Sequence, residues 1–390
     1  MKDFFADVHI HIGRTRTGRA VKITGAKTLT IDQILIEASE SKGMGMIGVI
    51  DAQSPEVLEE LMDGVNEGRY VELADGGLSF GKTVLLLGSE LEINDECSSG
   101  PIHVLAFMPT LRKMATFSSW LSLHMKNVHL SSQRLYVDGK TLQYKVKELG
   151  GLFIPAHIFT PHKSLYGKGV KTSLTEVFDP DLIDAVELGL SCDTSMASQL
   201  SELNRYPFLT NSDAHSLGKI AREYTKIRMQ HASFTEFQLA LQEKEGRKIT
   251  GNYGLAPRLG KYYHTTCEKC GTTPAHGAES CLSCGHSRFT KGVSERLKEL
   301  ADQKNQSNRR PPYIHQLPLQ FIPGVGAKTL QKLKAAFKTE MNILHQVTEQ
   351  ELQAVLPQKT AGLIVRARKG EVNLIAGGGG IYGKVDVSGG

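Results

Sequence analysis

Histidine and carboxylate residues recur at the ends of short apolar runs throughout the first 250 residues of the chain. The runs alternate with amphipathic, helix-like segments, and this alternation predicts an α/β fold with a parallel sheet or barrel. Residues two apart on a strand point to the same face, and in barrel folds the carboxyl ends of the strands carry the active site. We therefore expect these polar groups to gather in one place: His9, His11, Asp51, Glu90, Glu92, His103, His157, Asp213 and His215.

The residue types in this set indicate a metal centre. Imidazole and carboxylate groups suit zinc, manganese or iron, and a cluster of such ions activates water for phosphoester hydrolysis. A single buried histidine is more often a core residue, but a core role does not explain so many at strand ends. We predict two or three divalent ions (zinc, manganese or magnesium, with iron as a further candidate) bound by His9, His11, Asp51, Glu90, His103, His157, Asp213 and His215.

Within this set, Glu90 or Asp213 is expected to bridge two ions, and Glu90, Asp213 and His215 are the predicted catalytic groups. Glu92 is a weaker candidate that either lies behind the ligands or faces solvent. Asp7 is expected to orient a ligand by hydrogen bonding.

Two basic loops follow His11 and His157. So many basic groups fit an extended phosphate backbone better than a small phosphomonoester; the alternative is a solvated loop surface. Tyr166 or Phe159 could stack on a base, with an ordinary core position as the alternative. The candidate DNA contacts in these loops are Arg14, Arg16, Arg19, Lys163, Tyr166 and Lys168, and the same loops also carry Lys22, Lys27, His162 and Lys171.

Four of the six cysteines form two Cys-x-x-Cys pairs separated by ten residues, Cys267/Cys270 and Cys281/Cys284. Four thiolates close a tetrahedral zinc site and leave no open position for catalysis. We predict one structural zinc, whose binding supplies the folding free energy of this small segment. The segment either grips DNA or locks two domains together.

The C-terminal part of the chain is basic, with 16 Lys/Arg against 8 Asp/Glu from residue 285 onward. It contains LPLQFIPGVGAKTLQKLKAAF (317–337), in which a short apolar helix is expected before a glycine turn and a second helix near Ala327. Backbone amides at such a turn can hold a phosphate, so Gly324, Gly326 and Lys328 are candidate DNA contacts. The segment resembles a helix-hairpin-helix motif, with a degenerate copy at 348–370. The alternative is a helical protein-interaction domain.

The motifs DVHIH, VID, GSELEI, PAH and SDAH, with the histidine of HVLAF, resemble those of the polymerase-and-histidinol-phosphatase (PHP) superfamily across about residues 1–250. The resemblance implies a distorted (β/α)7 barrel with a two- or three-metal phosphoesterase site. The chain departs from the superfamily pattern at Ala52, where a histidine usually follows the aspartate, and at Gly13-Arg14, where a further histidine often occurs.

A PHP barrel, a four-cysteine module and a helix-hairpin-helix tail together resemble the endonuclease Q family, as do FTPHKSLYG and GNYGLAPRLGKYYHTTCEKCG. The resemblance covers nearly the whole chain. It implies a DNA repair endonuclease that cuts 5′ to deaminated bases (uracil, hypoxanthine, xanthine) and to abasic sites. It also implies that the damaged nucleotide flips into a pocket between the barrel face and the 110–150 insertion or the zinc module.

We expect DNA containing damaged bases as the partner, with a replication or repair factor as a further one, no membrane, and a cytoplasmic, nucleoid-associated location. The alternatives are a PHP-type small-molecule phosphatase and a non-catalytic DNA-binding adaptor. The expected segments are a barrel at 1–251 with an insertion at 110–150, a zinc module at 252–289, a linker helix at 290–312, a helix-hairpin-helix domain at 313–376 and a flexible glycine-rich tail at 377–390.

Overall fold

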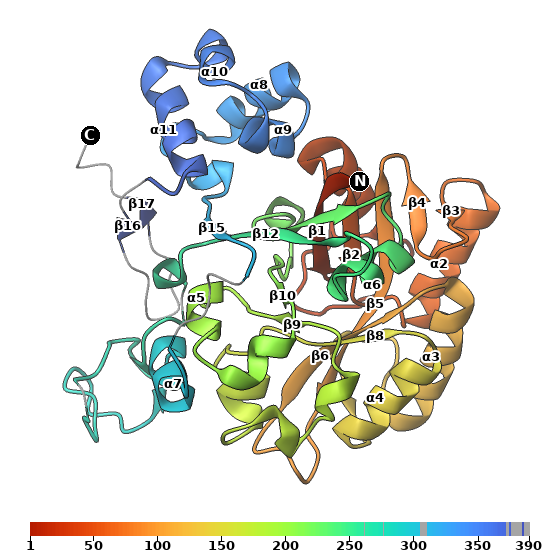
Figure 1. Ribbon diagram of the computed structural model, residues 1–390, viewed down its shortest axis with the longest axis vertical. Helices are drawn as coiled ribbons and strands as arrows, with labels where there is room; N and C mark the ends of the chain where they lie inside the picture. The colour runs from red at the N-terminus through yellow and green to blue at the C-terminus, as the bar shows by residue number, and fades with distance from the viewer. Residues whose placement is uncertain (261, 276, 305–309, 372–373, 376–383, 386–390) are drawn as a thin grey trace.

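The chain is described by a computed structural model that covers residues 1–260, 262–275, 277–304, 310–371, 374–375 and 384–385. Figure 1 shows a barrel-like body, the C-terminal helices packed above it and a cysteine-containing segment that projects to one side. Among the described residues, the helices are too short or too polar to span a membrane.

A ring of seven short strands forms the centre of the body. Backbone hydrogen bonds between Ile158 and Glu187 and between Asp184 and Phe153 join the last antiparallel strand of the ring to the next one, and a bridge between Ile10 and Ala214 closes the ring. The ring thus matches the seven-stranded barrel expected from the sequence. Its strands are β1 (Lys2–Ile10), β2 (Met46–Val49), β5 (Thr83–Ile93), β6 (Ile102–Met108), β8 (Leu152–Pro155), β9 (Val186–Glu187) and β10 (Phe208–Leu209).

The expectation of parallel strands is wrong for β6, which runs antiparallel to both β5 and β8. The connection between β5 and β6 spans only residues 94–101, and parallel neighbours need a crossover of about a dozen residues or more. The reversal has a consequence for the site. His103, near the start of β6, lies at the same end of the ring as the last residues of β1 and β5.

The first strand contains a β-bulge that redirects its histidines. Asp7 pairs with Ile47 but Ile10 pairs with Val49, so β1 advances three residues while β2 advances two. Before the bulge, Val8 packs in the apolar cluster inside the ring; after it, Ile10 packs in the separate outer cluster. A bulge of this kind shifts the alternation of side chains by one position, which lets His9 follow Val8 into the ring.

Further strands extend the sheet on both sides of the ring. On one side they are β4 (Leu78–Phe80) and β3 (Val71–Glu72); on the other they are β11 (Tyr224–Met229), β12 (Lys248–Gly254) and β15 (Tyr313–His315). Helix α6 (Phe234–Leu241) closes the apolar interior with Phe234 and Phe237. The outer wall includes α1 (Ile31–Ile36), α2 (Pro55–Asn66), α3 (Leu111–His124) and α4 (Gly139–Glu148).

The segment expected to be an insertion at 110–150 is part of this wall. Phe117 and Leu121 of α3 and Leu142 and Val146 of α4 are fully buried in the outer apolar cluster, so these helices provide the connection between β6 and β8. Only the stretch between α3 and α4, which includes β7 (Arg134–Leu135), reaches the end of the barrel that holds the polar cluster.

The predicted linker helix is also part of the body. Helix α7 (Val293–Leu300) buries Val293 and Leu297, and Arg296 donates to the backbone carbonyls of Tyr166, Val170 and Lys171 at 2.7–3.0 Å. Residues 305–309 of the expected linker lie outside the described residues. The strands β13 (Thr266–Cys267) and β14 (Phe289–Thr290) and the short helix α5 (Thr194–Ala197) complete this side.

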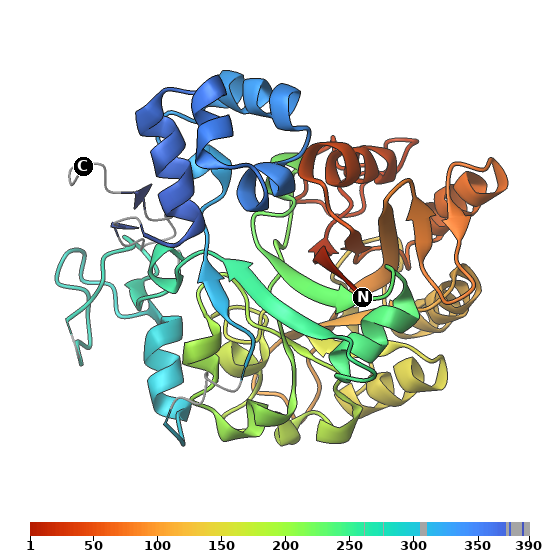
Figure 2. The same cartoon turned by 45° about the horizontal axis from the view of Figure 1, so that its top comes forward.

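The C-terminal helices α8 (Ala327–Phe337), α9 (Glu340–His345), α10 (Glu349–Val355) and α11 (Gln358–Arg368) form one bundle that packs on the barrel (Figure 2). Lys42 contacts Glu340 at 2.9 Å, and the Tyr224 hydroxyl lies 2.7 Å from His345 Nε2. The second helix of the first hairpin begins at Ala327 as predicted, but the first is a single turn, η9 (Leu319–Phe321). Because β15 pairs with β12 in the barrel sheet, the helical bundle does not begin at residue 313 but after this strand.

The remaining short elements are η1 (Glu37–Lys42), η2 (Leu165–Gly169), η3 (Leu174–Glu176), η4 (Pro180–Leu182), η5 (Ser201–Arg205), η6 (Leu217–Lys219), η7 (Pro257–Leu259), β16 (Leu374–Ile375) and β17 (Lys384–Val385). Apart from 384–385, the expected flexible tail at 377–390 lies outside the described residues.

Candidate active site

Glu90 stands at the centre of the polar cluster at the open end of the ring. Its Oε1 lies 2.9 Å from His103 Nδ1, 3.4 Å from His157 Nε2 and 3.5 Å from His9 Nε2. Its Oε2 lies 3.6 Å from His11 Nε2. One carboxylate therefore lies close to four imidazoles from three segments of the chain, which is the geometry expected of a bridging ligand.

Asp213 lies close to three imidazoles, two of which also lie close to Glu90. Its Oδ1 lies 3.5 Å from His9 Nε2, from His11 Nε2 and from His215 Nδ1. His9, His11, Glu90, His103, His157, Asp213 and His215, predicted from separate strand ends, thus converge in space.

The donor atoms of this cluster fit divalent cations. The ligand atoms fall into three overlapping groups, each within 4.8 Å: His9/His11/Glu90, Glu90/His103/His157 and His11/Asp213/His215. The Nε2 atoms of three of these imidazoles (His9, His11 and His103) are buried, and within the described residues they have no hydrogen-bond partner. Because a buried nitrogen without a partner is costly, these atoms are suited to metal binding.

Glu187 holds two of the ligands in place and was not predicted. Its Oε2 lies 2.9 Å from His9 Nδ1 and accepts from the backbone amide of His157 at 3.0 Å, while Oε1 accepts from the Asn211 side chain. A carboxylate of this kind fixes the tautomer and orientation of a metal-binding imidazole. The available sequence signal was its position as a lone carboxylate in the apolar run AVELGLS.

Asp51 supports the site in a way that differs from its predicted role as a ligand, whereas Asp7 orients ligands through hydrogen bonds to their loop. Asp51 Oδ2 accepts from the Ile12 amide at 2.7 Å and lies 3.2 Å from His11 Nδ1, so it sits behind His11, outside the three ligand groups. Asp7 accepts from the backbone amides of Ser212 and Ala221 at 3.0 and 2.8 Å. It therefore orients the loop that carries Asp213 and His215, and no imidazole directly.

Together, the charges within the cluster outweigh the effect of burial on the pKa values of Glu90 and His9. Burial raises the pKa of Glu90, but His103 and Lys22 hold that pKa well below its ordinary value. Burial lowers the pKa of His9, yet Glu187 and Asp213 hold it well above its ordinary value. Glu92 takes a peripheral place: the imidazole of His103, whose Nε2 lies 3.8 Å from Glu92 Oε2, and the ammonium of Lys163 at 2.9 Å lower the pKa of Glu92 to about 2.

His157 and Asp213 adopt left-handed backbone conformations, with φ of 31° and 46°. Such conformations cost residues other than glycine on the order of 1–3 kcal/mol and persist where the surrounding structure enforces them, commonly at functional sites. Here the hydrogen bond from the His157 amide to Glu187 and the anchoring of the 212–221 loop by Asp7 provide that enforcement.

The cluster opens into a cavity of about 460 Å³, which is also lined by Lys22, His162, Leu190, Arg222 and Tyr262. Tyr262 comes from the segment just before the paired cysteines, and its ring lies 5.5 Å from that of His162. The cavity is therefore bounded on one side by the segment that leads into the paired cysteines.

Two predicted base-contacting aromatics are core residues instead. Tyr166 and Phe159 are 0% and 1% exposed, their rings stack 5.2 Å apart, and the Tyr166 hydroxyl donates to Glu202. The prediction of Tyr166 as a DNA contact is therefore wrong. Burial by α7 and the η2 turn could not be read from the local sequence, and the aromatic residue that lines the cavity is Tyr262.

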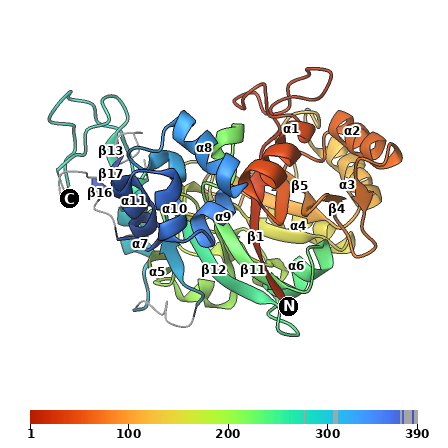
Figure 3. The ribbon, with the colours of Figure 1, turned by 90° about the horizontal axis from the view of Figure 1, so that it is seen from above.

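The predicted basic contacts are placed unevenly. Arg16 and Arg19 pair with Asp63 and Glu56 of α2 at 3.2 and 3.6 Å, and Arg14 donates to a carbonyl within its own loop. Lys163, Lys168, Gly324, Gly326 and Lys328 are exposed. Figure 3 shows the loop after β1 and the cysteine-containing segment rising on the same side of the molecule. Their DNA contacts stay predictions.

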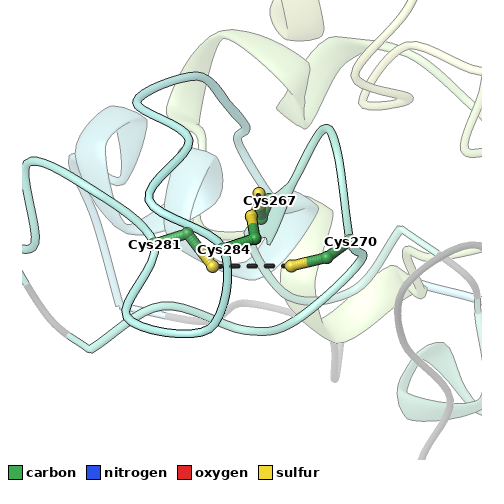
Figure 4. Close-up of side chains that lie close together, drawn as sticks. All are labelled: Cys267, Cys270, Cys281 and Cys284. Carbon is green, nitrogen blue, oxygen red and sulfur yellow. Dashed lines mark hydrogen bonds between the residues drawn. The ribbon is translucent and has the colours of Figure 1, made fainter.

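The four paired cysteines converge as predicted (Figure 4). The Sγ atoms of Cys267 and Cys284 lie 3.6 Å apart, those of Cys270 and Cys281 lie 3.5 Å apart, and all four fit within 4.8 Å of one another. Four sulfurs at this spacing suit one tetrahedral ion such as zinc.

No family model matches the chain. It is 66% identical over 385 residues to YqxK of Bacillus subtilis (strain 168), covering 99% of this chain and all of that protein. It is 37% identical over 281 residues to MJ0043 of Methanocaldococcus jannaschii, a match that spans 65% of this chain and 34% of that longer protein.

Two solved structures resemble the whole chain. The lesion-specific endonuclease PfuEndoQ from Pyrococcus furiosus superposes with a TM-score of 0.85 at 28% identity, covering 99% of this chain and 96% of that one. Endonuclease Q in complex with a 27-mer duplex bearing an abasic lesion at its active site gives the same TM-score and identity, covering 100% and 97%. Since the likeness extends over the barrel, the cysteine segment and the C-terminal helices together, the chain belongs to the endonuclease Q family.

Proposed function

We propose that this chain nicks DNA on the 5′ side of deaminated bases (uracil, hypoxanthine and xanthine) and of abasic sites. Family membership makes it a metal-dependent DNA repair endonuclease. The range of lesions that it recognises goes beyond family membership and is the subject of this proposal. One observation carries it: the ligand cluster opens into a cavity of about 460 Å³ beside an aromatic residue, Tyr262, and such a cavity can accept a nucleotide extruded from the stack.

We further propose that the barrel holds two ions. His11 Nε2 can bind one ion, so the groups His9/His11/Glu90 and His11/Asp213/His215 cannot both be filled through it. This leaves one ion for Glu90, His103 and His157. We assign the second to His9 and His11 together with Asp213, whose Oδ1 lies 3.5 Å from the Nε2 atom of each. Bound there, divalent cations supply water activation and neutralisation of phosphoryl charge.

The protein groups position and balance these charges. Glu90 bridges the two ligand sets, and Glu187 fixes His9 in the tautomer that presents Nε2. His215 Nδ1 lies 3.0 Å from the carbonyl of Asp213. A hydrogen bond there leaves Nε2 as the nitrogen available to a DNA oxygen or an ion. A single zinc in the cysteine cluster would shape the wall that carries Tyr262.

The contacts to DNA outside the cavity are assigned to the exposed Lys163 and Lys168 and to the turn before α8 at Gly324, Gly326 and Lys328. Arg14, Arg16 and Arg19 are assigned a weaker part in phosphate binding, since Arg16 and Arg19 pair with carboxylates of α2. These groups would bind phosphates without reading sequence, which suits an enzyme that recognises damage. A replication or repair factor as a second partner, and a nucleoid location, belong to the same proposal.

The test uses end-labelled duplexes that carry uracil, hypoxanthine, xanthine, an abasic site or no lesion, each with magnesium, manganese or zinc. The proposal predicts a nick immediately 5′ to each lesion, with 3′-hydroxyl and 5′-phosphate ends, and no cut in the undamaged duplex. Equal cutting of the undamaged duplex, or turnover of p-nitrophenyl phosphate without any nicking, contradicts it.

A further inference from the structure

Lys22 differs from the other basic residues of the loop after β1. Its Nζ lies 3.3 Å from Glu90 Oε2 and 2.6 Å from Ser132 Oγ, and its side chain is only 15% exposed. Arg16 and Arg19 of the same loop reach outward to α2, and Lys27 is exposed. Lys22 instead lines the cavity with the ligand cluster.

The stretch between α3 and α4 completes the surroundings of this ammonium. Ser132 Oγ also hydrogen-bonds Glu90 Oε2, and Ser131 Oγ lies 3.1 Å from His11 Nδ1. Lys22, Ser132 and Glu90 thus form one connected unit in which the lysine approaches the proposed bridging carboxylate from the side of the loop. A largely buried ammonium is retained at a cost unless it is paired, and Glu90 and Ser132 supply that pairing.

A lysine is unexpected in a site built to hold cations, because its charge repels them. The place of Lys22 is explained if its charge serves the substrate. Hydrolysis of a phosphodiester forms a bond from a water oxygen to phosphorus and breaks the bond to the departing 3′-oxygen. Charge on the phosphate oxygens is redistributed as this happens, and fixed donors aimed at those oxygens stabilise the transition state.

We propose that Lys22 is a catalytic residue that contacts a non-bridging oxygen of the scissile phosphate and acts as a fixed third cation beside the metal pair. The inference rests on the proposed nuclease function. The ammonium of Lys22 differs from the metal ions in one respect: it is part of the chain, so chelators do not remove it. Lys22 also differs from the exposed basic residues, because its effect falls on the chemical step and not on affinity for DNA.

The experiment compares K22M, K22Q and K22R with K27M, which removes a charge from the same loop at an exposed position. Each variant is assayed on an abasic duplex for kcat and KM, and its metal content per chain is measured by mass spectrometry. We expect both neutral Lys22 variants to lose about 100-fold in kcat, in line with loss of one transition-state donor. KM should stay within about threefold and the metal content should be unchanged. K22R should retain part of the activity, and K27M should keep the wild-type kcat.

Phosphorothioate substrates provide a readout that a structural role would not move. Replacing one non-bridging oxygen by sulfur should slow the wild type for each diastereomer, and one of the two effects should disappear in K22M. Retention of both effects, a K22M kcat equal to the wild type, or loss of metal from K22M overturns the proposal. If the wild type itself fails to nick the abasic duplex, the proposed function is wrong and this inference with it; a wild type that cuts no faster than K22M overturns the role of Lys22 alone.

Discussion

The molecule carries two clusters of metal-binding side chains that are built in opposite ways. The barrel cluster takes its ligands from strand ends between His9 and His215, and it opens into a cavity of about 460 Å³. The cysteine cluster takes all four ligands from residues 267–284, between two-residue strands. Hydrogen bonds and an apolar core hold the barrel ligands in place, whereas the cysteine segment buries few side chains besides Cys267 and Cys281.

This contrast separates two uses of a metal. An open site with histidine and carboxylate ligands can admit a substrate, whereas a site closed by four thiolates cannot. We infer that the barrel forms its site without needing the ions, and that the cysteine segment needs its ion in order to fold.

Glu90→Gln should abolish most of the activity and leave the fold intact. A neutral amide cannot bridge two cations, so kcat on an abasic duplex should fall by about a thousandfold or more. Glu92→Gln is the matched control, because Glu92 lies two residues away on the same strand and pairs with Lys163; it should lose less than about tenfold. A Glu90→Gln variant that unfolds, or that nicks at the wild-type rate, breaks the comparison.

Cys267→Ser should show the opposite pattern. Binding of zinc to such a site contributes on the order of 10–16 kcal/mol, so the variant should lose one zinc per chain and residues 262–292 should become sensitive to protease. The melting of the barrel should shift by only a few degrees. Elemental analysis and limited proteolysis check both points. Undiminished zinc would refute the assignment, and loss of the barrel transition would show that the two regions fold as one.

Glu187→Gln sharpens the account of how the barrel ligands are held. The amide can no longer accept a full charge-assisted hydrogen bond from His9, and changes of this kind typically cost about 10–100-fold in metal affinity or activity. Titration of the metal-free protein with manganese measures the affinity. An affinity equal to that of the wild type would mean that His9 is oriented by other contacts.

Glu223 provides a pH test within the barrel. Burial raises its pKa to about 8, and its Oε2 has no hydrogen-bond partner within the described residues. The folded state therefore holds a proton that the unfolded state releases near pH 4.5, so this group makes the fold less stable as pH rises from about 4.5 to 8. The loss is on the order of 1.4 kcal/mol per pH unit.

Denaturant unfolding of the wild type and of Glu223→Gln at pH 5 and pH 8 measures this effect. The variant should match the wild type at pH 5 and exceed it in stability at pH 8. The stability of the cysteine segment should change with pH in the opposite direction, since acid protonates thiolates and weakens metal binding. A difference between the two proteins that does not change with pH would show that Glu223 is ionised in the fold.

The convergence of most of the predicted ligands and an α/β sheet or barrel were predictable from periodicity, whereas the ring of seven strands was implied by the resemblance to the PHP superfamily. Histidine and carboxylate residues at strand ends identify the open end of a barrel, and this inference does not depend on the conformation of the loops. The reversed direction of β6, the bulge in β1 and the role of Glu187 were not predictable in this way. Each depends on which strands are neighbours, and a single sequence does not state that.

In the loops, the exposure of Lys22 and Tyr166 was likewise not predictable from the sequence. Both lie in loops that read as exposed and basic, yet Lys22 turns into the metal site and Tyr166 is covered by α7. The segment at 110–150 reads as an insertion from its sequence, yet α3 and α4 bury apolar side chains in the wall of the barrel. In each case, contact with a distant part of the chain decides the exposure of the side chain.

We infer that the barrel cluster holds the catalytic ions. Anomalous diffraction from crystals of the full chain grown with manganese tests it directly. We expect two manganese peaks, one among Glu90, His103 and His157 and one among His9, His11 and Asp213, with a zinc peak at the four cysteines. A preparation that nicks lesion-bearing DNA with manganese but shows no peak at the barrel ligands would contradict it.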